Sequence, residues 1–561
     1  MLTSIVLVLF SLLVIYRSLS FYRSLQHHIS QARESGLKFY ISPFYFQSVP
    51  WILLQEALLP VLLKLPTSWT DSWLPLSLFF RIWHYGYKPF EAADNDTFIV
   101  ASSGGNVLWT CDPDVIMQVS SRHKDFVKPI GMLGMLNIYG PTITASEGEE
   151  HRTYRRIAAP SFNEETHRTV WEESLKQGEM MLQVWSENSG SVKDLNSYAS
   201  LFALHVLSKA FFQKQMTWDE DHQLPSGHTL PYADAVSSVF KYAQTLFMMP
   251  RRLLEHSPSS KHKKAIQAFV EFRKYMDEMV IATSTNVGTT PHSEGGNLLQ
   301  NFVKATFVED TALNITHDAV LGNLFIFILA GHETSANTMT FAIALLAYRP
   351  RFQAALHADL DSILGEGDPT TWSYSHHYPK LINGHVGALM KETLRLYTVL
   401  PFFPKTNEHF QTLSVQGESV AIHPKTLIMV NTSATHRNPK YWPTAREHSK
   451  SEPPHPLSSF NPERWLQRFG EVGGETESNF KPGSYIPFAE GFRSCMGSRF
   501  ASIEFCAAIA RIFSQYRVEF EGGTSPEALR KAEQQLSSGV GFELGLKLKD
   551  PLVVRFVKRN W

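Results

Sequence analysis

The stretch that decides the fold is Phe488-Ala-Glu-Gly-Phe-Arg-Ser-Cys-Met-Gly497, which sets one cysteine between two glycines and beside an arginine. An amphipathic run, Ser498 to Tyr516, follows at once. If a helix begins beside Cys495, its positive potential and its first N–H groups stabilise a thiolate there. The glycines have no Cβ, so the loop can turn sharply and a flat macrocycle can approach its backbone. We therefore interpret Cys495 as a thiolate ligand for iron.

The same stretch contains a side chain that could bind an anionic group. Arg493 lies two residues before Cys495, and its guanidinium suits a forked contact with an anionic group at the edge of a macrocycle. The pattern Phe-x-x-Gly-x-Arg-x-Cys-x-Gly resembles the haem-binding loop of the cytochrome P450 family. The resemblance implies haem b with Cys495 as axial ligand, and it assigns cofactor contacts to Phe488, Gly491, Arg493 and Gly497. The alternative is a buried core cysteine in a glycine-rich turn.

The longest helical pattern predicts a helix from about His317 to Tyr348, capped by Thr316 and stopped by Pro350. It is apolar on nearly every side, as in a helix buried in a large core. Ala-Gly-His-Glu-Thr interrupts it at residues 330–334, where a glycine and a threonine that bonds back to the preceding turn could open a groove. This segment resembles the family's oxygen-activation motif, which implies that Glu333 and Thr334 deliver protons. A solvent-facing polar turn is the alternative.

Two downstream motifs predict a structural support. Glu392 and Arg395 lie three residues apart and therefore on one helical face, a spacing that usually gives an exposed salt bridge of little value. Phe-Asn-Pro-Glu-Arg-Trp follows at residues 460–465. Together the two motifs resemble the family's structural triad, which implies that Glu392, Arg395 and Arg464 hold the scaffold of the ligand loop.

A fifth match is imperfect. The run from Glu147 to Arg156 resembles the family's Trp-x-x-x-Arg helix, but His151 replaces the tryptophan while Arg155 keeps its position. The resemblance implies that both side chains meet a haem propionate, and histidine can donate that hydrogen bond. Lys405 and His436 are weaker candidates for the propionates. A charged, solvated helix is the alternative for this region.

Composition indicates a folded protein with a mainly α fold and small β-sheets. Hydrophobic residues make up 43% and charged residues 19% of the 561 residues, which excludes disorder of the whole chain. A net charge of -1 gives no electrostatic case for nucleic acid. Strand-like runs cluster near residues 98–109, 412–430 and 541–557. The resemblance implies the cytochrome P450 fold, with haem between the long central helix and the cysteine loop.

The N-terminus predicts membrane attachment. Leu2 to Tyr16 is apolar apart from Thr3 and Ser11, lacks a preceding basic region, and has no good cleavage site after it, so an uncleaved anchor over residues 1–22 is favoured over a signal peptide. Positive charge at Arg17 and Arg23 places the remainder in the cytosol. An interfacial helix is the alternative.

Three domains are expected: the anchor over residues 1–22, a membrane-proximal connection over residues 23–85 and a haem-binding catalytic domain over residues 86–561. We interpret the tryptophan- and leucine-rich tract that begins at Trp51 as lying on the lipid surface, with an ordinary core helix as the alternative. The resemblance to eukaryotic microsomal, fungal-type members implies a single-pass protein of the endoplasmic reticulum.

The expected activity is that of a monooxygenase which inserts one oxygen atom of O2 into a C–H or C=C bond of a bulky apolar molecule in natural-product biosynthesis. The resemblance implies electrons from NADPH through a separate reductase, with cytochrome b5 as a further candidate donor. Two rivals are a haem-thiolate isomerase or dehydratase that needs neither O2 nor reductase, and a non-enzymatic haem sensor or binding protein. Retained Glu333 and Thr334 argue against both.

Overall fold

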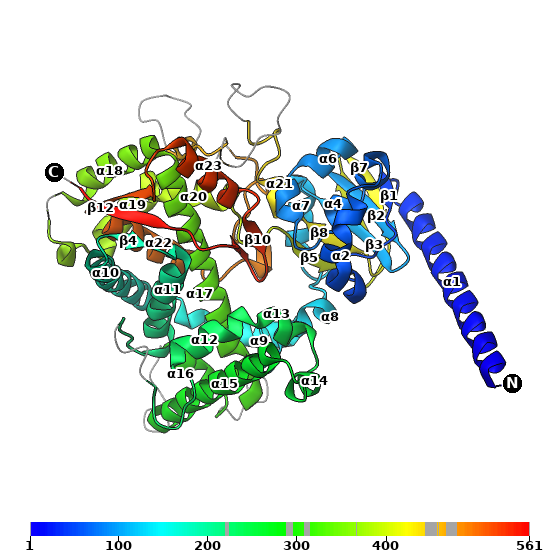
Figure 1. The fold of residues 1–561 in the computed structure, drawn as a ribbon, viewed down its shortest axis with the longest axis horizontal. Coiled ribbons are helices and arrows are strands. Elements are labelled where there is room, and N and C mark those ends of the chain that lie inside the picture. The colour runs from blue at the N-terminus through cyan, green and yellow to red at the C-terminus, as the bar shows by residue number, and fades with distance from the viewer. Residues whose placement is uncertain are drawn as a thin grey trace. The chain divides into compact units, whose positions relative to one another are not determined.

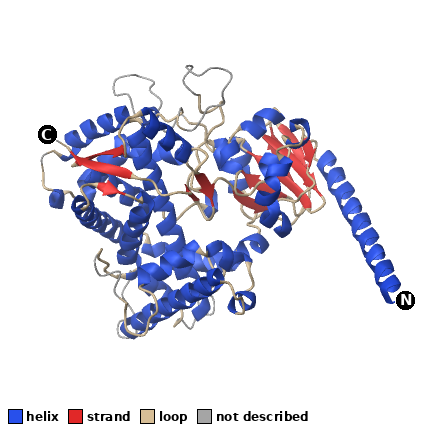
Figure 2. Cartoon of the chain, viewed as in Figure 1, coloured by secondary structure: helices blue, strands red, loops and turns tan. Residues whose placement is uncertain are grey.

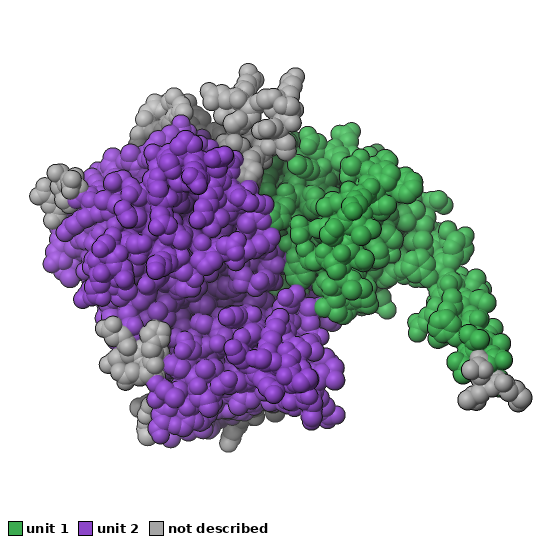
Figure 3. All heavy atoms as spheres, viewed as in Figure 1, with its two compact units in different colours: residues 1–129, 400–446, 478–494 green, residues 130–399, 447–477, 495–561 purple. Residues whose placement is uncertain are grey.

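The computed structural model describes residues 2–218, 224–287, 296–307, 315–365, 367–443, 457, 459–466 and 480–559. Helices dominate and the strands form small separate sheets, so the predicted mainly α fold is confirmed (Figure 2). The chain forms two compact units. Unit 1 contains residues 1–129, 400–446 and 478–494, and unit 2 contains residues 130–399, 447–477 and 495–561 (Figure 3).

Unit 1 is built on a five-stranded sheet in the order β1-β2-β3-β8-β5. Its members are β1 (Phe39–Ile41), β2 (Thr97–Ser102), β3 (Gly105–Thr110), β8 (Leu427–Val430) and β5 (Phe403–Thr406). Strands β2 and β3 form an antiparallel hairpin, and both are buried along their whole length. A second hairpin pairs β6 (Gln411–Val415) with β7 (Glu418–Ile422).

Helix α1 (Leu2–Glu34) runs past the predicted end of the anchor at residue 22 and docks on this sheet (Figure 1). Ser24 Oγ donates a hydrogen bond to Ser103 O at 2.6 Å, and Ile29 and Ala32 are buried in the core beneath β2 and β3. The apolar side chains that precede these turns are exposed. The first part of α1 is therefore an apolar helix without a protein partner in the described chain, and its last turns belong to the fold.

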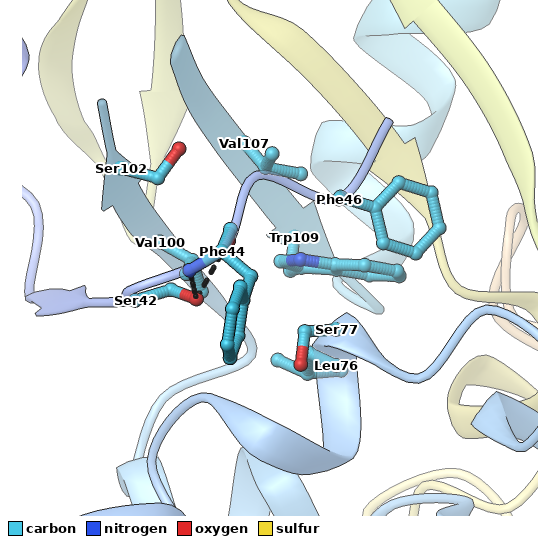
Figure 4. A pocket seen from close by; sticks show the side chains of 9 residues that line it. All are labelled: Ser42, Phe44, Phe46, Leu76, Ser77, Val100, Ser102, Val107 and Trp109. Atoms are coloured by element: carbon cyan, nitrogen blue, oxygen red, sulfur yellow. Dashed lines mark hydrogen bonds between the residues drawn. The ribbon is translucent and has the colours of Figure 1, made fainter. Parts of the chain in front are cut away.

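Short helices complete unit 1: α2 (Val49–Leu62), α3 (Thr67–Thr70), α4 (Leu74–Ser77), α5 (Ile82–Tyr85), α6 (Lys88–Ala93), α7 (Pro113–Ser121), α21 (Thr432–Thr435) and the 3-10 turn η6 (Gly491–Arg493). The aromatic tract is divided between two environments. On α2, Leu53, Leu54, Leu58 and Val61 are exposed. Trp73, Leu76 and Trp83 beyond it are buried, as in an ordinary core. Near α4, Phe44, Phe46 and Trp109 surround a small pocket (Figure 4).

Unit 2 is a helical body. Its longer helices are α9 (Gly148–Ala158), α10 (Glu164–Glu187), α11 (Leu195–Phe212), α12 (Tyr232–Lys241), α15 (Ser260–Val287), α17 (His317–Tyr348), α18 (Pro350–Leu364), α19 (Tyr374–Asn383), α20 (His385–Leu396), α22 (Ser498–Phe513) and α23 (Pro526–Leu536). Shorter turns are α8 (Ile130–Leu133), η1 (Gly134–Leu136), η2 (Ala159–Ser161), α13 (Ala243–Met248), α14 (Arg251–Glu255), α16 (Leu298–Lys304), η3 (Pro369–Thr371) and η4 (Pro462–Trp465).

Helix α17 has the predicted limits. Thr316 Oγ1 accepts a hydrogen bond from Ala319 N at 3.2 Å, which caps the first turn, and Pro350 begins the next helix. Helices α11, α20 and α22 pack against it. The polypeptide at Gly140 and Pro141 approaches so closely that a Cβ on Gly322 would lie 2.4 Å from Gly140 O. Close packing therefore fixes glycine at position 322.

Two small antiparallel sheets accompany the helices of unit 2. One has the order β4-β12-β9, with β4 (Ser191–Val192), β12 (Val554–Lys558) and β9 (Tyr516–Phe520). The other pairs β10 (Val540–Phe542) with β11 (Leu546–Leu548). The three strand-rich regions were predicted correctly. The predicted helix from Ser498 to Tyr516 is too long, because α22 ends at Phe513 and Tyr516 begins β9.

Candidate active site

Cys495 is the accessible cysteine of this chain, since Cys111 and Cys506 are buried. It precedes α22, whose N-cap, Gly497, provides no side chain to the first N–H groups of the helix. Burial raises the pKa of the Cys495 thiol, while a hydrogen bond from the Gly497 backbone and the charge of Arg155 lower it. Protein atoms therefore lie around the sulfur, although part of the residue is accessible.

Gly497 lies beside this sulfur, and neither its neighbours nor its backbone angles require a glycine at this position. A Cβ at position 497 would lie 3.9 Å from Cys495 Sγ and 3.9 Å from the Phe162 ring, which is ordinary contact, and the φ angle is -90°. The missing side chain thus leaves room next to the thiol.

The first half of the ligand loop belongs to unit 1, and Gly491 determines its course. Its φ angle is +71°, and a Cβ there would lie 2.4 Å from Ser120 O. Both facts favour glycine. The close neighbour of Gly491 is the end of α7, so packing within unit 1 accounts for this glycine without a macrocycle. Phe488 and Arg493 are half-buried, and Phe492 stacks on His123 with ring centroids 4.5 Å apart.

The two weaker propionate candidates have structural partners within unit 1. His436 is fully buried, and its Nε2 accepts a hydrogen bond from Ile486 N at 2.8 Å. Lys405 Nζ donates to Phe126 O at 3.2 Å. His436 therefore fixes the segment that leads into the ligand loop.

Helix α9 presents the residues of the imperfect fifth motif on one face. His151 is buried and Arg155 is half-buried, one helical turn apart. The positive charge of Arg155 lowers the pKa of the Cys495 thiol, so Arg155 belongs to the electrostatic surroundings of the sulfur. The alternative of a wholly solvated helix does not hold, because Tyr154 and Ile157 are buried as well.

The middle of α17 has an accessible stripe in a helix that is otherwise largely buried. Phe327, Ala330 and Thr334 keep accessible surface, and their spacing puts them on one helical face. Thr334 Oγ1 donates to Ala330 O at 2.6 Å, the predicted back-bond. The helix continues through Gly331, where a Cβ would lie 2.1 Å from Leu207 Cδ1. Glycine there serves the packing of α11, and Ala330 and Thr334 lie on the accessible stripe.

Glu333, beside this stripe, is half-buried, and its Oε2 atom is enclosed by protein. Burial raises the pKa of its carboxyl to about 7, the positive charge of Lys547 lowers it and Glu543 raises it. Lys547 Nζ pairs with Glu543 Oε2 at 2.5 Å across the β10–β11 hairpin. The Glu333 carboxyl can therefore gain and lose a proton near neutral pH, as a proton carrier must. Neighbouring His332 is buried against Phe240, and burial lowers its pKa to about 4.

The structure brings the three residues of the predicted triad together. Arg395 Nε and Nη2 donate to the two oxygens of Glu392 at 2.9 and 2.8 Å, and Arg464 Nε lies 3.2 Å from Oε2. Glu392 is fully buried; burial acts to raise its pKa, but Arg395 and Arg464 outweigh this and hold it below the usual range. Trp465 Nε1 also donates to Glu392, at 2.9 Å.

Sequence reasoning missed the part played by Trp465 and by the backbone of Asn461, which donates to Glu392 Oε1 at 2.9 Å. Asn461 and Trp465 lie in the same motif as Arg464, residues 460–465. Their closeness to Arg464 in the sequence could have indicated that they also contact Glu392. It also missed Glu504, a fully desolvated carboxyl on α22, because a lone glutamate in an apolar helix has no distinguishing pattern.

These residues fit a haem group. An accessible thiol with a guanidinium in its surroundings matches a thiolate-ligated iron and an anionic edge. Helix α17 adds an apolar stripe that ends in a hydroxyl and a titratable acid.

Comparisons with known proteins agree with this geometry. The model of the family described as Cytochrome P450 matches residues 95–540. A cytochrome P450 monooxygenase of Arthrobotrys oligospora is 27% identical, over 98% of this chain and 97% of that protein. The phomenoic acid biosynthesis cluster cytochrome P450 monooxygenase of Leptosphaeria maculans is 26% identical, over 91% and 92% of the two chains.

A bacterial relative and a solved structure extend the comparison. The cyclooctat-9-en-7-ol 5-monooxygenase of Streptomyces melanosporofaciens is 25% identical over 77% of this chain and 84% of its own. The crystal structure of the cytochrome P450DA haem domain superposes with a TM-score of 0.65 at 18% identity, covering 84% of this chain and 92% of that one.

Proposed function

This chain belongs to the cytochrome P450 family, and from that premise we propose that it oxidises a bulky apolar small molecule in the biosynthesis of a fungal secondary metabolite. Membership makes it a monooxygenase that uses haem b and takes electrons from a redox partner reductase. The relative from Leptosphaeria maculans is named for the phomenoic acid biosynthesis cluster, and the relative from Streptomyces is named a 5-monooxygenase of cyclooctat-9-en-7-ol. These names support, for this chain, hydroxylation or epoxidation of a natural product.

Cys495 would hold the iron, and Arg155, His151 and Arg493 would bind the propionates. When bound, haem with a thiolate ligand supplies the activation of dioxygen. The accessible thiol beside Gly497 carries this assignment.

Glu333 and Thr334 would hold and move the protons that the reaction consumes. The Thr334 hydroxyl rests on Ala330 O and lies on the accessible stripe, so it can donate a hydrogen bond to a group beside α17. The Glu333 carboxyl, with a pKa of about 7, can supply and recover a proton one residue away. A haem sensor or a peroxide isomerase would have little use for this pair.

The N-terminal helix fits a membrane anchor. In this proposal it crosses the endoplasmic reticulum membrane once, with the remainder cytosolic, and electrons arrive from NADPH-cytochrome P450 reductase, with cytochrome b5 as a second donor. The exposed leucines of α2 would rest on lipid, since both helices belong to unit 1 and α2 has a buried face only at Trp51, Gln55 and Leu59.

The test is turnover with isotopically labelled dioxygen. Metabolites that accumulate after deletion of the gene serve as substrates for the purified holoenzyme with reductase and NADPH. We expect one labelled oxygen atom in the product. Conversion that proceeds without NADPH or without dioxygen would overturn the proposal in favour of an isomerase or dehydratase.

Thr334→Ala tests the proton path separately. The variant should release more hydrogen peroxide per NADPH oxidised, because protons no longer reach the reacting oxygen in order. Thr338→Ala is the matched control: Thr338 Oγ1 makes the same kind of back-bond, to Thr334 O at 2.8 Å, one turn further along α17. Equal peroxide yields from the two variants would remove Thr334 from the proton path.

A further inference from the structure

Helix α7 runs alongside the segment that leads to the ligand cysteine, residues 480–494. At the start of α7, Lys481 Nζ donates a hydrogen bond to Asp114 Oδ2 at 2.6 Å. At its end, the segment comes so close that a Cβ on Gly491 would lie 2.4 Å from Ser120 O. The helix and the segment both belong to unit 1. The segment is therefore held at both ends of α7.

This segment contains a strained residue. Ala489 has a φ angle of +57°, a left-handed conformation in which the Cβ of an L-residue crowds the following carbonyl oxygen. Such a conformation persists only where neighbouring contacts hold it. Ala489 N donates to Ile486 O at 3.1 Å and Ser494 N donates to Gly491 O at 3.0 Å, but both bonds lie within the segment itself. The contacts that hold the segment come from the rest of unit 1.

His123 supplies one of these contacts close to the cysteine. It follows the last residue of α7, Ser121, by two positions, and its ring stacks on Phe492 with centroids 4.5 Å apart and planes 25° apart. Phe492 lies in η6, three residues before Cys495, and 38% of its surface is exposed. Because much of the Phe492 ring faces solvent, stacking on His123 adds to what burial alone contributes to holding it.

The residue before His123 fixes the turn from which it projects. Arg122 Nε donates to Asp125 Oδ2 at 2.9 Å, and Arg122 Nη1 and Nη2 donate to Thr412 O and Gln411 Oε1, each at 2.6 Å. Gln411 and Thr412 lie on β6, in the second hairpin of unit 1. The turn is therefore tied to a hairpin, and His123 can act as a fixed support for the ring that stacks on it.

We propose that His123 is a positioning residue whose ring, stacked on Phe492, holds η6 and thereby keeps Cys495 in position as the ligand of the haem iron. The inference rests on the proposed function, since it takes Cys495 as that ligand. His123 acts through Phe492 and takes no part in the chemistry. An aromatic pair shifts an equilibrium by a factor of about two to ten, which sets the size of the effects expected below.

The first experiment measures amide hydrogen exchange of the holoenzyme over residues 488–494. His123→Ala should speed exchange in this peptide about two- to tenfold, and His123→Phe, which keeps a ring for stacking, should restore the wild-type rate. His423→Ala is the matched control, because the His423 ring also meets a phenylalanine of unit 1, Phe410, with centroids 5.7 Å apart, and neither residue belongs to the ligand loop. Wild-type exchange in His123→Ala would overturn the inference.

The second experiment asks whether the positioning reaches the thiolate. In mild denaturant, the reduced carbon monoxide complex of His123→Ala should lose its band at about 450 nm about two- to tenfold faster than the wild type does. Phe492→Leu should lose the band as fast as His123→Ala, and the double variant should lose it no faster, because both changes remove one contact. His123→Phe should match the wild type. Additive effects of the two substitutions would contradict the positioning role.

A general loss of stability is excluded by unfolding followed with far-ultraviolet circular dichroism, whose midpoint should be the same in His123→Ala and the wild type. A fall in this midpoint that accounts for the faster loss of the band would overturn the inference. Slower reduction by the reductase with unchanged hydrogen exchange would also overturn it, and would assign the stacked pair to partner docking.

Failure of this inference differs from failure of the proposed function. If His123→Ala leaves both exchange and band unchanged while labelled oxygen still enters the product, only the inference fails. If Cys495→Ala keeps the band, the ligand assignment fails, and with it the role proposed for His123, even where the exchange result is as expected.

Discussion

Glu333 lies in the middle of the largely apolar helix α17, where its carboxyl has a pKa of about 7 because burial disfavours the charged form. The unfolded chain would ionise this group near its ordinary value of 4.5. Between these values the folded state keeps a proton that the unfolded state releases. Stability therefore falls as pH rises from 4.5 to 7, and it is insensitive to this group outside that window.

Glu333→Gln should remove this loss. Relative to the variant, the wild type should lose about 1.4 kcal/mol of unfolding free energy per pH unit between pH 5 and 7, a total of about 3 kcal/mol. Denaturant unfolding of the detergent-solubilised holoenzyme at several pH values measures the difference. A difference that is constant with pH would mean that Glu333 ionises normally in the folded protein.

Glu392 is a buried acid whose negative charge is paired with the positive charges of Arg395 and Arg464. Glu392→Ala leaves Arg395 and Arg464 without their counter-charge, and should cost about 3 to 5 kcal/mol of unfolding free energy. Glu56 is the control, because its pair with Arg81 is exposed (39% and 46% for the Arg81 and Glu56 side chains), so that Glu56→Ala should cost about 1 kcal/mol or less. Similar losses in the two variants would contradict a supporting role for the triad.

Individual residues were predictable from sequence where several motifs agreed in order along the chain. Cys495, Thr334 and the triad were predicted in this way. The structure brings Glu392, Arg395 and Arg464 into contact, and the roles of Cys495 and Thr334 stay predictions. The reasons for the glycines were less predictable. Gly491 is required by its positive φ angle and by Ser120 O, and Gly331 packs closely on the Leu207 side chain; these are contacts between segments far apart in the chain, which local spacing does not reveal.

At the scale of elements, α17 was predictable to the residue because capping threonine and stopping proline enclose an apolar run. The short strands β1, β4, β5 and β9 were not, because strands of two to five residues have little periodicity of their own and are defined by their partners. Tyr516–Phe520, for example, pairs with the last strand of the chain.

Gly322→Ala tests how closely the polypeptide at Gly140 packs on α17. An alanine ordinarily stabilises a helix interior relative to glycine by about 1 kcal/mol. Here its Cβ would meet backbone oxygens at 2.4 and 2.5 Å, so the sign should reverse and unfolding free energy should fall by about 1 to 3 kcal/mol. Gly131→Ala, with nothing within 4 Å of its Cβ, should be neutral or stabilising. If Gly322→Ala raised the unfolding free energy instead, the backbone at Gly140 and Pro141 would be able to move away from α17 at little cost.

At the scale of the whole molecule, α1 combines an exposed apolar part with turns that belong to unit 1. Removal of residues 2–22 should leave Ile29 and Ala32 in place and the fold intact, while the membrane attachment weakens. In fractionated cells the full chain should resist a high-salt and alkaline wash, and the shortened chain should be extracted by it. A shortened chain that still resists the wash would transfer the anchoring role from α1 to another surface such as α2.

The most direct test of the central claim is the absorbance of the reduced carbon monoxide complex of the haem-loaded protein. Thiolate ligation by Cys495 predicts a band at about 450 nm in the wild type. Cys495→Ala should abolish it, whereas Cys506→Ala, which changes a buried cysteine on α22, should retain it. Persistence of the band without the Cys495 thiol would contradict the account.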